Sequence, residues 1–447
     1  MSALSERDFF NEVDERDLFN EVESSVRSYC RSFPAIFTSA HGATMVDTTG
    51  RRFIDFLAGA GTLNYGHNNP IIKRKLIEYI ASDGIMHSLD LHTSAKHKFI
   101  ETLYDVILKP RNLDYKVAFP GPTGANAVEL SLKIARLATG RQGVVAFTNA
   151  YHGMSQGALA VSGTKSKREG AGMLLSGVSR LPFDGYLGEL DTAELLEKML
   201  EDAGSGLDTP AAIIVETVQG EGGLNVASAR WMRRIAQLAS RYGIVLIVDD
   251  IQAGCGRTGT FFSFEGQDIT PDIVCLSKAL GGMGLPLSLV LLRPDLDVLS
   301  PGQHNGTFRG NNLAFVAGAA ALDFWRAPSF ERSVKCTGEK LRERLDAIVA
   351  RYPEHGTHVR GRGLLIGLSW TDPTIAGRVS QQAYARGLII ETSGAKNQVL
   401  KFLPPLTVSD AELEKGLAIV EDAVAAVLES RTITHPRIEL AATNAAM

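Results

Sequence analysis

The sequence predicts an α/β protein with a large, doubly wound and mostly parallel sheet, followed by a smaller α+β domain. The first observation is that short apolar strands alternate with segments of helical periodicity between about residues 70 and 320. The second is that these strands are apolar at every position, which is typical of strands covered by helices on both faces. The predicted strands are near residues 117–119, 144–147, 212–216, 244–249, 273–276 and 287–292.

A change of pattern after residue 320 divides the chain. Residues 1–66 are predicted to form an N-terminal arm with short strands that joins the small domain, and residues 67–320 the large domain. Residues 321–430 would form the small C-terminal domain, and residues 431–447, rich in Thr, Ala and Asn, a flexible tail. The small domain should contain helices and strands over residues 331–351, 364–370, 388–391, 399–403 and 410–428.

Composition excludes several classes of protein. With 46 Lys and Arg against 50 Asp and Glu, the net charge of −4 argues against nucleic-acid binding. No apolar run reaches the roughly 18 residues of a membrane span, and the first residues have no apolar core of a signal peptide. The cysteines are scattered without metal-ligand spacing, so we expect a cytoplasmic protein with reduced thiols and no metal site. They are Cys30, Cys255, Cys275 and Cys336.

Lys278 is the most informative residue in the chain. It follows the predicted strand at 273–276, and Asp249 ends another predicted strand 29 residues earlier. Ligands of open α/β sheets bind at the carboxyl ends of the strands. Pyridoxal phosphate (PLP) requires a lysine for its Schiff base and a carboxylate that keeps its pyridine nitrogen protonated. A lone lysine after a strand is more often an ordinary surface residue, so the prediction depends on the neighbouring motifs.

Residues 121–129 predict an anion site. They follow the strand at 117–119 and begin a helix, with Thr123 as the N-cap. Free N–H groups at a helix start bind phosphate, and Thr123, Gly124 and Ala125 are placed to do so. The alternative for this motif alone is a plain N-capped turn.

Further polar and aromatic residues follow other predicted strands. Tyr151 and His152 come after the strand at 144–147, where an aromatic side chain can stack on a planar ring. Glu216 and Glu221 lie in a glycine-rich segment at the end of the strand at 212–216. Ile251 and Gln252 follow Asp249. Ile251 can pack on the face of a planar ring, and Gln252 can hydrogen-bond to a hydroxyl group of that ring. Singly, each of these has an ordinary structural alternative, such as core packing or a solvated loop.

Taken together and in this order, the motifs over residues 30–430 resemble the class III, fold-type-I, PLP-dependent aminotransferases. The resemblance implies that Lys278 bonds covalently to PLP and that Asp249 pairs with the ring nitrogen. It also implies that Gln252 contacts the ring hydroxyl, while Tyr151 and Ile251 lie on either side of the ring. The phosphate would be held by residues 123–125 and by Thr307 of a second subunit, which makes a homodimer or higher oligomer the active form.

The segments 26–34, 59–67 and 304–311 narrow the resemblance to class III members that act on diaminobutyrate and 2-oxoglutarate. The implied reaction moves the amino group of glutamate to aspartate 4-semialdehyde and gives diaminobutyrate for ectoine or related biosynthesis. Many ornithine and 4-aminobutyrate aminotransferases have Arg where this chain has Met154 and Lys401, and Lys cannot form the bidentate Arg contact. The candidates for substrate binding are therefore Glu221, Lys401, Arg309 and Asn64.

Three alternatives remain open at this stage. Ornithine or 4-aminobutyrate aminotransferase is the nearest, and Met154 with Lys401 argues against it. A PLP-dependent mutase or racemase would need no 2-oxoglutarate, so dependence on that acceptor discriminates. A non-catalytic PLP-binding regulator should carry a DNA-binding domain or lack Lys278, and neither holds here.

Overall fold

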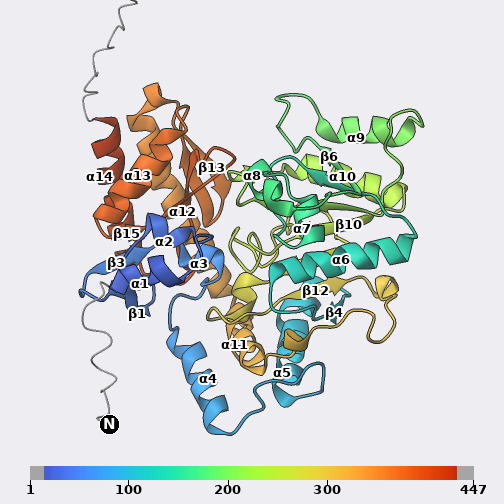
Figure 1. Cartoon of the computed structure of the whole chain (residues 1–447), viewed down its shortest axis with the longest axis horizontal. Coiled ribbons are helices and arrows are strands. Elements are labelled where there is room, and N and C mark those ends of the chain that lie inside the picture. Colours follow the sequence, from blue (N-terminus) through green and yellow to red (C-terminus); the bar gives the residue numbers. More distant parts are fainter. Residues whose placement is uncertain (1–14, 430–447) are drawn as a thin grey trace, which may run out of the picture.

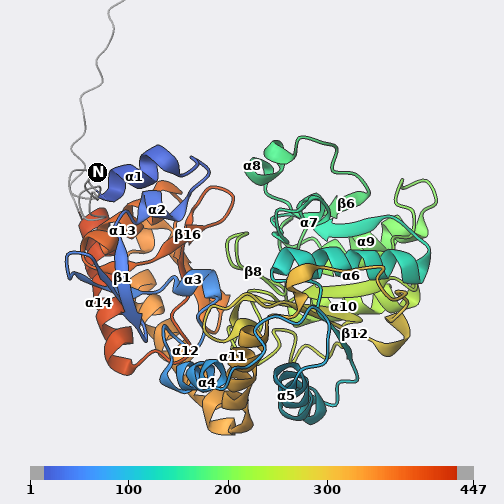
Figure 2. The ribbon, with the colours of Figure 1, turned by 60° about the horizontal axis from the view of Figure 1, so that its bottom comes forward.

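The computed structural model describes residues 15–429, which form a larger and a smaller lobe (Figure 1). The larger lobe is drawn mainly from cyan to yellow. The smaller lobe combines the blue N-terminal elements with the orange and red C-terminal ones (Figures 1 and 2). The predicted tail at 431–447 and the start of the predicted N-terminal arm lie outside the described residues.

The larger lobe is built on a seven-stranded sheet in the order β4-β12-β11-β10-β7-β5-β6. Only β12 runs antiparallel to its neighbours, β11 and β4, while the other neighbouring pairs are parallel. This confirms the predicted mostly parallel sheet. The strands are β4 (Lys116–Ala118), β5 (Val144–Phe147), β6 (Val178–Leu181), β7 (Ala212–Val215), β10 (Val245–Asp249), β11 (Ile273–Leu276) and β12 (Leu289–Leu292).

One strand of this sheet was not predicted. β6 lies at the edge of the sheet and reads Val-Ser-Arg-Leu, so it lacks the continuous apolar pattern of its neighbours. An edge strand pairs on one side only and tolerates polar side chains. The apolar pattern therefore could not reveal it.

Helices cover both faces of the sheet. Alternate strand residues such as Val144, Ile214 and Ile247 pack with α6 on one face. The residues between them, such as Val145 and Val248, pack in the core that includes α5, α10 and α11. The helices of this part are α4 (Pro70–Ala81), α5 (Ser94–Thr102), α6 (Gly124–Thr139), α7 (Gln156–Val161), α8 (Lys165–Arg168), α9 (Thr192–Glu201), α10 (Ala229–Arg241) and α11 (Asn312–Leu322). The short helix α3 (Ala58–Gly61) lies with the N-terminal elements of the smaller lobe (Figure 1).

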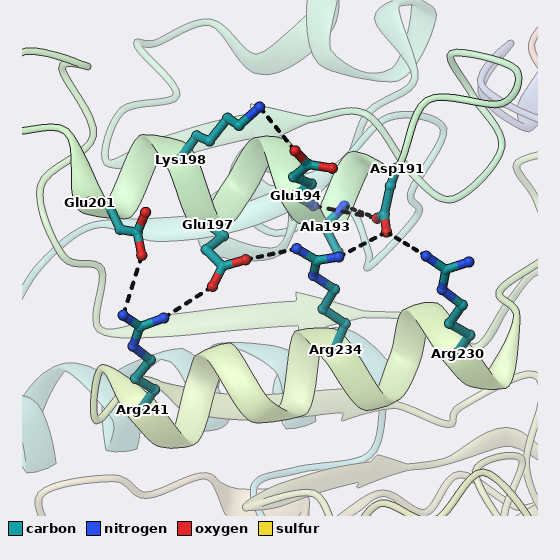
Figure 3. Close-up of polar contacts among 9 residues, drawn as sticks. All are labelled: Asp191, Ala193, Glu194, Glu197, Lys198, Glu201, Arg230, Arg234 and Arg241. Carbon is teal, nitrogen blue, oxygen red and sulfur yellow. Dashed lines mark hydrogen bonds and ion pairs between the residues drawn. The ribbon is translucent and has the colours of Figure 1, made fainter.

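Ion pairs join α9 to α10 on the outside of the larger lobe (Figure 3). Arg234 contacts Asp191 at 3.1 Å and Glu197 at 2.7 Å, and Arg241 contacts Glu197 at 3.0 Å. Asp191 also caps α9 by accepting hydrogen bonds from the first-turn amides. Because these side chains are partly exposed, the network fixes the position of α9 more than it stabilises the fold.

The smaller lobe contains two four-stranded sheets. One has the order β13-β14-β17-β16, and the other, β1-β2-β3-β15, pairs N-terminal strands with a C-terminal one. The strands are β1 (Phe37–His41), β2 (Thr44–Asp47), β3 (Arg52–Asp55), β13 (His358–Arg362), β14 (Leu365–Ser369), β15 (Leu388–Ile389), β16 (Glu391–Ser393) and β17 (Val399–Phe402). A separate hairpin is formed by β8 (Val218–Gln219) and β9 (Asn225–Val226). The remaining helices are α1 (Glu15–Val22), α2 (Tyr29–Ser32), α12 (Pro328–Arg351), α13 (Thr374–Ala385) and α14 (Asp410–Leu428).

The structure corrects two details of the predicted smaller domain. The single strand predicted at 388–391 is two strands, because β15 pairs with β3 whereas β16 pairs with β17. The polar strand β13 was not predicted. The predicted domain boundary at residue 320 falls inside α11. The division of the chain into domains stays a prediction. No helix among residues 15–429 combines the length and the apolar character that crossing a bilayer requires.

Candidate active site

A cavity of about 300 Å³ lies where the strands of the large sheet end. Parallel strands bring the residues that follow β5, β7, β10 and β11 to one edge of the sheet. The cavity contains the predicted cofactor residues with the exception of Thr307. Its lining is Thr123, Gly124, Ala125, Tyr151, His152, Gly153, Met154, Glu216, Glu221, Asp249, Ile251, Gln252 and Lys278.

Lys278 enters this cavity from a strained position. It begins a short 3-10 helix directly after β11, and its backbone has a φ of 49°, in the left-handed region. Such a conformation is uncommon for a residue with a side chain and concentrates at functional sites. The Nζ atom donates to the carbonyl oxygen of Ala60 at 3.0 Å. Burial lowers the pKa of Lys278, which favours the neutral amine.

Asp249 and His152 form a buried pair opposite this lysine segment. Nδ1 of His152 lies 2.7 Å from Oδ2 of Asp249, and the other carboxylate oxygen accepts from the Ile251 amide at 3.1 Å. Burial alone would lower the pKa of His152, but its hydrogen bond with Asp249 and the attraction of that carboxylate raise it. Nε2 of His152 is buried without a hydrogen-bond partner. The contact fixes the orientation of the Asp249 carboxylate.

The start of α6 forms a further wall. Thr123 is its N-cap, as predicted, and forms a capping box in which its backbone amide donates to Oδ1 of Asn126 at 3.2 Å. The Thr123 hydroxyl donates to the same oxygen at 2.8 Å. The first helical amides have no intrahelical acceptor and are available to an anion. A Cβ atom on Gly124 would lie 2.9 Å from Cδ1 of Ile251, so a larger residue would displace that side chain.

Two glutamates and a glutamine complete the cavity. Oε2 of Glu216 accepts from the Tyr151 amide at 3.0 Å, and burial raises the pKa of Glu216 to about 8. Nε2 of Gln252 donates at 3.1 Å both to the Ala60 carbonyl and to Oε1 of Glu221. Oε1 of Gln252 is buried without a partner.

Lys401 lies behind Glu221 and is fully buried. Its Nζ atom is 2.7 Å from Oε1 of Glu221 and 2.9 Å from Oε1 of Glu391. Burial alone would raise the pKa of Glu221, but Lys401 and Lys278 lower it to about 2. Glu391 was missed by the sequence analysis, because its closeness to Lys401 depends on the pairing of β16 with β17, and the sequence carries no signal for that pairing.

Besides Lys401, three predicted residues lie outside this cavity. Asn64 is buried, donates to the Cys255 carbonyl at 2.9 Å and accepts from Arg257, so both ends of its amide are already used. Arg309 and Thr307 lie in the short 3-10 helix Thr307–Arg309, where the Thr307 carbonyl accepts from His87 at 2.6 Å. Met154 does line the cavity and presents an apolar side chain there.

Comparison with known proteins now identifies the family. The family model described as aminotransferase class-III matches residues 26–424. A diaminobutyrate–2-oxoglutarate transaminase of Halalkalibacterium halodurans is 53% identical over 92% of this chain and 96% of its own length. One from Nocardia farcinica is 55% identical over 93% of this chain and 95% of its own.

Solved structures are similar as well. The ornithine aminotransferase of Toxoplasma gondii has a TM-score of 0.80 and 26% identity over 96% of this chain and 97% of its own. A PLP-bound amine transaminase from an uncultivated Pseudomonas species has a TM-score of 0.79 and 26% identity, and the match covers 91% of this chain and 98% of its own.

The chain belongs to the class III aminotransferases. Like them it is a PLP-dependent transferase of fold type I. The cavity of this aminotransferase fits the cofactor. It offers a lysine, a carboxylate–imidazole pair and a helix start, and two of its lining residues keep a buried polar atom without a protein partner, His152 and Gln252.

Proposed function

We propose that this aminotransferase moves the amino group of L-glutamate to the aldehyde of L-aspartate 4-semialdehyde, which gives L-2,4-diaminobutyrate and 2-oxoglutarate. The observation that carries the proposal is the Glu221–Lys401 ion pair at the cavity that contains Lys278. The names of the two relatives at 53% and 55% identity support it further. The product would supply ectoine or related biosynthesis.

The two half-reactions place different demands on one pocket. Glutamate presents its α-amino group, so its α-carboxylate comes close to the reacting carbon, whereas diaminobutyrate presents an ω-amino group with no carboxylate beside it. A cation that a glutamate side chain can cover or expose serves both substrates. We assign this role to Lys401, which the Glu221 side chain shields from the cavity, and the apolar Met154 offers no carboxylate contact at its own position.

The cofactor residues are assigned by their positions in the cavity. Bound PLP supplies the aldehyde that accepts the amino group and the ring that takes up the electron pair. Lys278 would hold it covalently, and the neutral amine of Lys278 would remove the proton from Cα of glutamate and return one to the ω-carbon of the product. Asp249, oriented by His152, would keep the ring nitrogen protonated, and Gln252 would contact the ring hydroxyl.

The remaining assigned residues bind the ring and the phosphate. Tyr151 and Ile251 would pack against the ring, and Glu216 orients Tyr151 through its backbone amide. The amides of Gly124 and Ala125 at the N-terminus of α6, with Thr123, would receive the phosphate.

We propose a homodimer in which Thr307 of the partner subunit completes the phosphate site. Thr307 lies outside the cavity of its own chain, and the neighbouring Phe308 is 66% exposed. Exposed apolar side chains in the adjacent segment, including Ile85, Met86 and Leu91, are also suited to burial against a second copy. The free cysteines among residues 15–429 are compatible with the proposed cytoplasmic location.

A product assay tests the proposed reaction. With glutamate and aspartate semialdehyde the enzyme should form diaminobutyrate and 2-oxoglutarate in equal amounts. Ornithine and 4-aminobutyrate should be poor donors to 2-oxoglutarate. Conversion of diaminobutyrate without any 2-oxo acid would favour a mutase or racemase, and preferred turnover of ornithine would replace the proposed substrate.

A further inference from the structure

The two carboxylates that contact Lys401 come from segments of different character. Glu221 lies in the turn between β8 and β9, lines the cavity and has a side chain that is 30% exposed. Glu391 belongs to β16, has a side chain that is 7% exposed and stands directly opposite Lys401 in the antiparallel β16–β17 pair. Neighbouring side chains at opposite positions of a ladder are kept together by the backbone hydrogen bonds.

Glu391 is therefore the fixed partner of Lys401, and Glu221 is the one that can leave. Tyr29 of α2 lies close to both carboxylates. Burial and the negative charges of Glu391 and Glu221 raise the pKa of its hydroxyl, which therefore stays neutral. When Glu221 moves away, the charge of Lys401 is still compensated by Glu391.

We propose that Glu391 is a positioning residue that sets the charge selectivity of the substrate site, by weakening the attraction of Lys401 for dicarboxylate substrates. The proposal rests on the proposed function in one respect, namely that Lys401 receives a substrate carboxylate. Glutamate has a net charge of −1 and 2-oxoglutarate of −2, whereas diaminobutyrate with both amines protonated has +1. A second carboxylate beside Lys401 disfavours the anions and favours the cation, which limits inhibition of the second half-reaction by the dicarboxylates.

The expected size of the effect follows from two opposing changes. Removing the charge of Glu391 takes a negative group away from the entering carboxylate, which strengthens dicarboxylate binding. The same removal strengthens the Glu221–Lys401 pair that the substrate must open, which offsets part of the gain. We expect a net change of about threefold to tenfold in affinity, in the range of a partly screened charge interaction.

The test uses the PLP-loaded enzyme and glutarate, an unreactive dicarboxylate, with Kd measured by calorimetry. Glu391→Gln should lower the Kd of glutarate by about threefold to tenfold, and the KM of glutamate in the same direction with a smaller change in kcat. The KM of diaminobutyrate should rise or stay constant. In a Glu221→Gln background, where no pair has to be opened, the additional effect of Glu391→Gln on glutarate should be larger.

Two further variants separate charge from structure. Glu391→Asp retains the charge and should keep the wild-type ratio of glutarate to diaminobutyrate affinity. Glu354→Gln removes an exposed glutamate of the same lobe, with a side chain that is 62% exposed, and should change neither constant. If Glu391→Gln does not fold, Glu391→Ala removes the same charge without a buried amide.

The proposal is overturned if Glu391→Gln leaves the glutarate Kd unchanged or raises it, or if both substrate types lose affinity equally. Failure of the proposed function has a different signature. In that case wild-type enzyme forms no diaminobutyrate, while the glutarate measurement still reports on Glu391 and Lys401.

Discussion

Lys401 and its two partners, Glu221 and Glu391, form a cluster of three charges, and replacing Lys401 with methionine removes the only cation among them. Methionine has a similar length and no charge, so it fills the space of a side chain that is fully buried. It leaves Glu221 and Glu391 facing each other without the cation that lies 2.7 Å and 2.9 Å from them. We expect a less stable protein with an altered response to pH and a weaker affinity for glutamate.

The stability change can be estimated from the structure. Lys401 is the main cause that lowers the pKa of Glu221 to about 2 from 4.5. At about 1.4 kcal/mol for each tenfold change in an ionisation constant, this corresponds to about 3 kcal/mol of stability at neutral pH. Removing one partner of a buried ion pair typically costs about 3–5 kcal/mol, in agreement with this value.

The sign of the pH dependence follows from the direction of the change. Because the folded-state pKa of Glu221 is depressed, its contribution is present above pH 4.5 and disappears as the pH falls towards about 2. In Lys401→Met that contribution is absent, and the two neighbouring carboxylates should take up a proton more readily. The stability difference between wild type and variant should therefore be largest near neutral pH and shrink in acid.

The assay is denaturant unfolding of both proteins between pH 3 and pH 7, together with steady-state kinetics. The KM for glutamate should rise by roughly 10- to 150-fold, the value of a lost charge-assisted contact, while simple ω-amines should be affected much less. Adding Glu391→Gln to Lys401→Met should restore part of the stability, because it removes one of the two unpaired carboxylates. A loss below about 1 kcal/mol with no pH dependence, or equal kinetic losses for both substrate types, would refute the reasoning.

Three further predictions concern the cofactor site. Borohydride should attach PLP to Lys278 in the wild type, and Lys278→Ala should remain unlabelled and inactive; wild-type turnover by that variant would remove Lys278 from its assigned role. Asp249→Asn should retain PLP but lose turnover by about 10²-fold or more. It should also lower the pKa of His152, measurable by NMR, because Asp249 is the main cause that raises this pKa; an unchanged rate would point to another carboxylate. Mixed dimers of Lys278→Ala and Thr307→Ala chains should regain activity, and activity equal to the sum of the two homodimers would argue against a shared site.

Much of the larger lobe was predictable from local pattern. The predicted apolar strands are present. Every residue of β5, β7, β10, β11 and β12 is buried, because both faces of these strands are covered, whereas the edge strand β4 starts with the exposed Lys116. The polar strands β6 and β13 and the division of residues 388–391 between two sheets escaped prediction. β6 and β13 are edge strands with polar residues and lack such a pattern, and the choice of pairing partner depends on residues far away in the sequence.

The cavity shows the same difference between features that local sequence predicts and features that depend on the fold. Lys278, Asp249 and the helix start at Thr123 follow strands of one parallel sheet, and parallel strands place their carboxyl ends together whatever the loops between them do. Their meeting in one cavity could therefore be expected from the sequence. The Ala60 carbonyl that receives Lys278 and the His152–Asp249 contact could not, because they depend on the path of loops.

By itself the sequence determined the class of sheet, the strand-end lysine and aspartate, and the family that these residues resemble. Only the tertiary structure decided that Lys401 is a buried cation with two carboxylate partners, and that Asn64 is already engaged by Arg257 and Cys255. Strand periodicity is a local property that neighbouring residues encode. The charge state of a buried group depends on every ionisable side chain within a few ångströms, and in this protein those side chains come from positions 221, 391 and 401, which only the folded chain brings together.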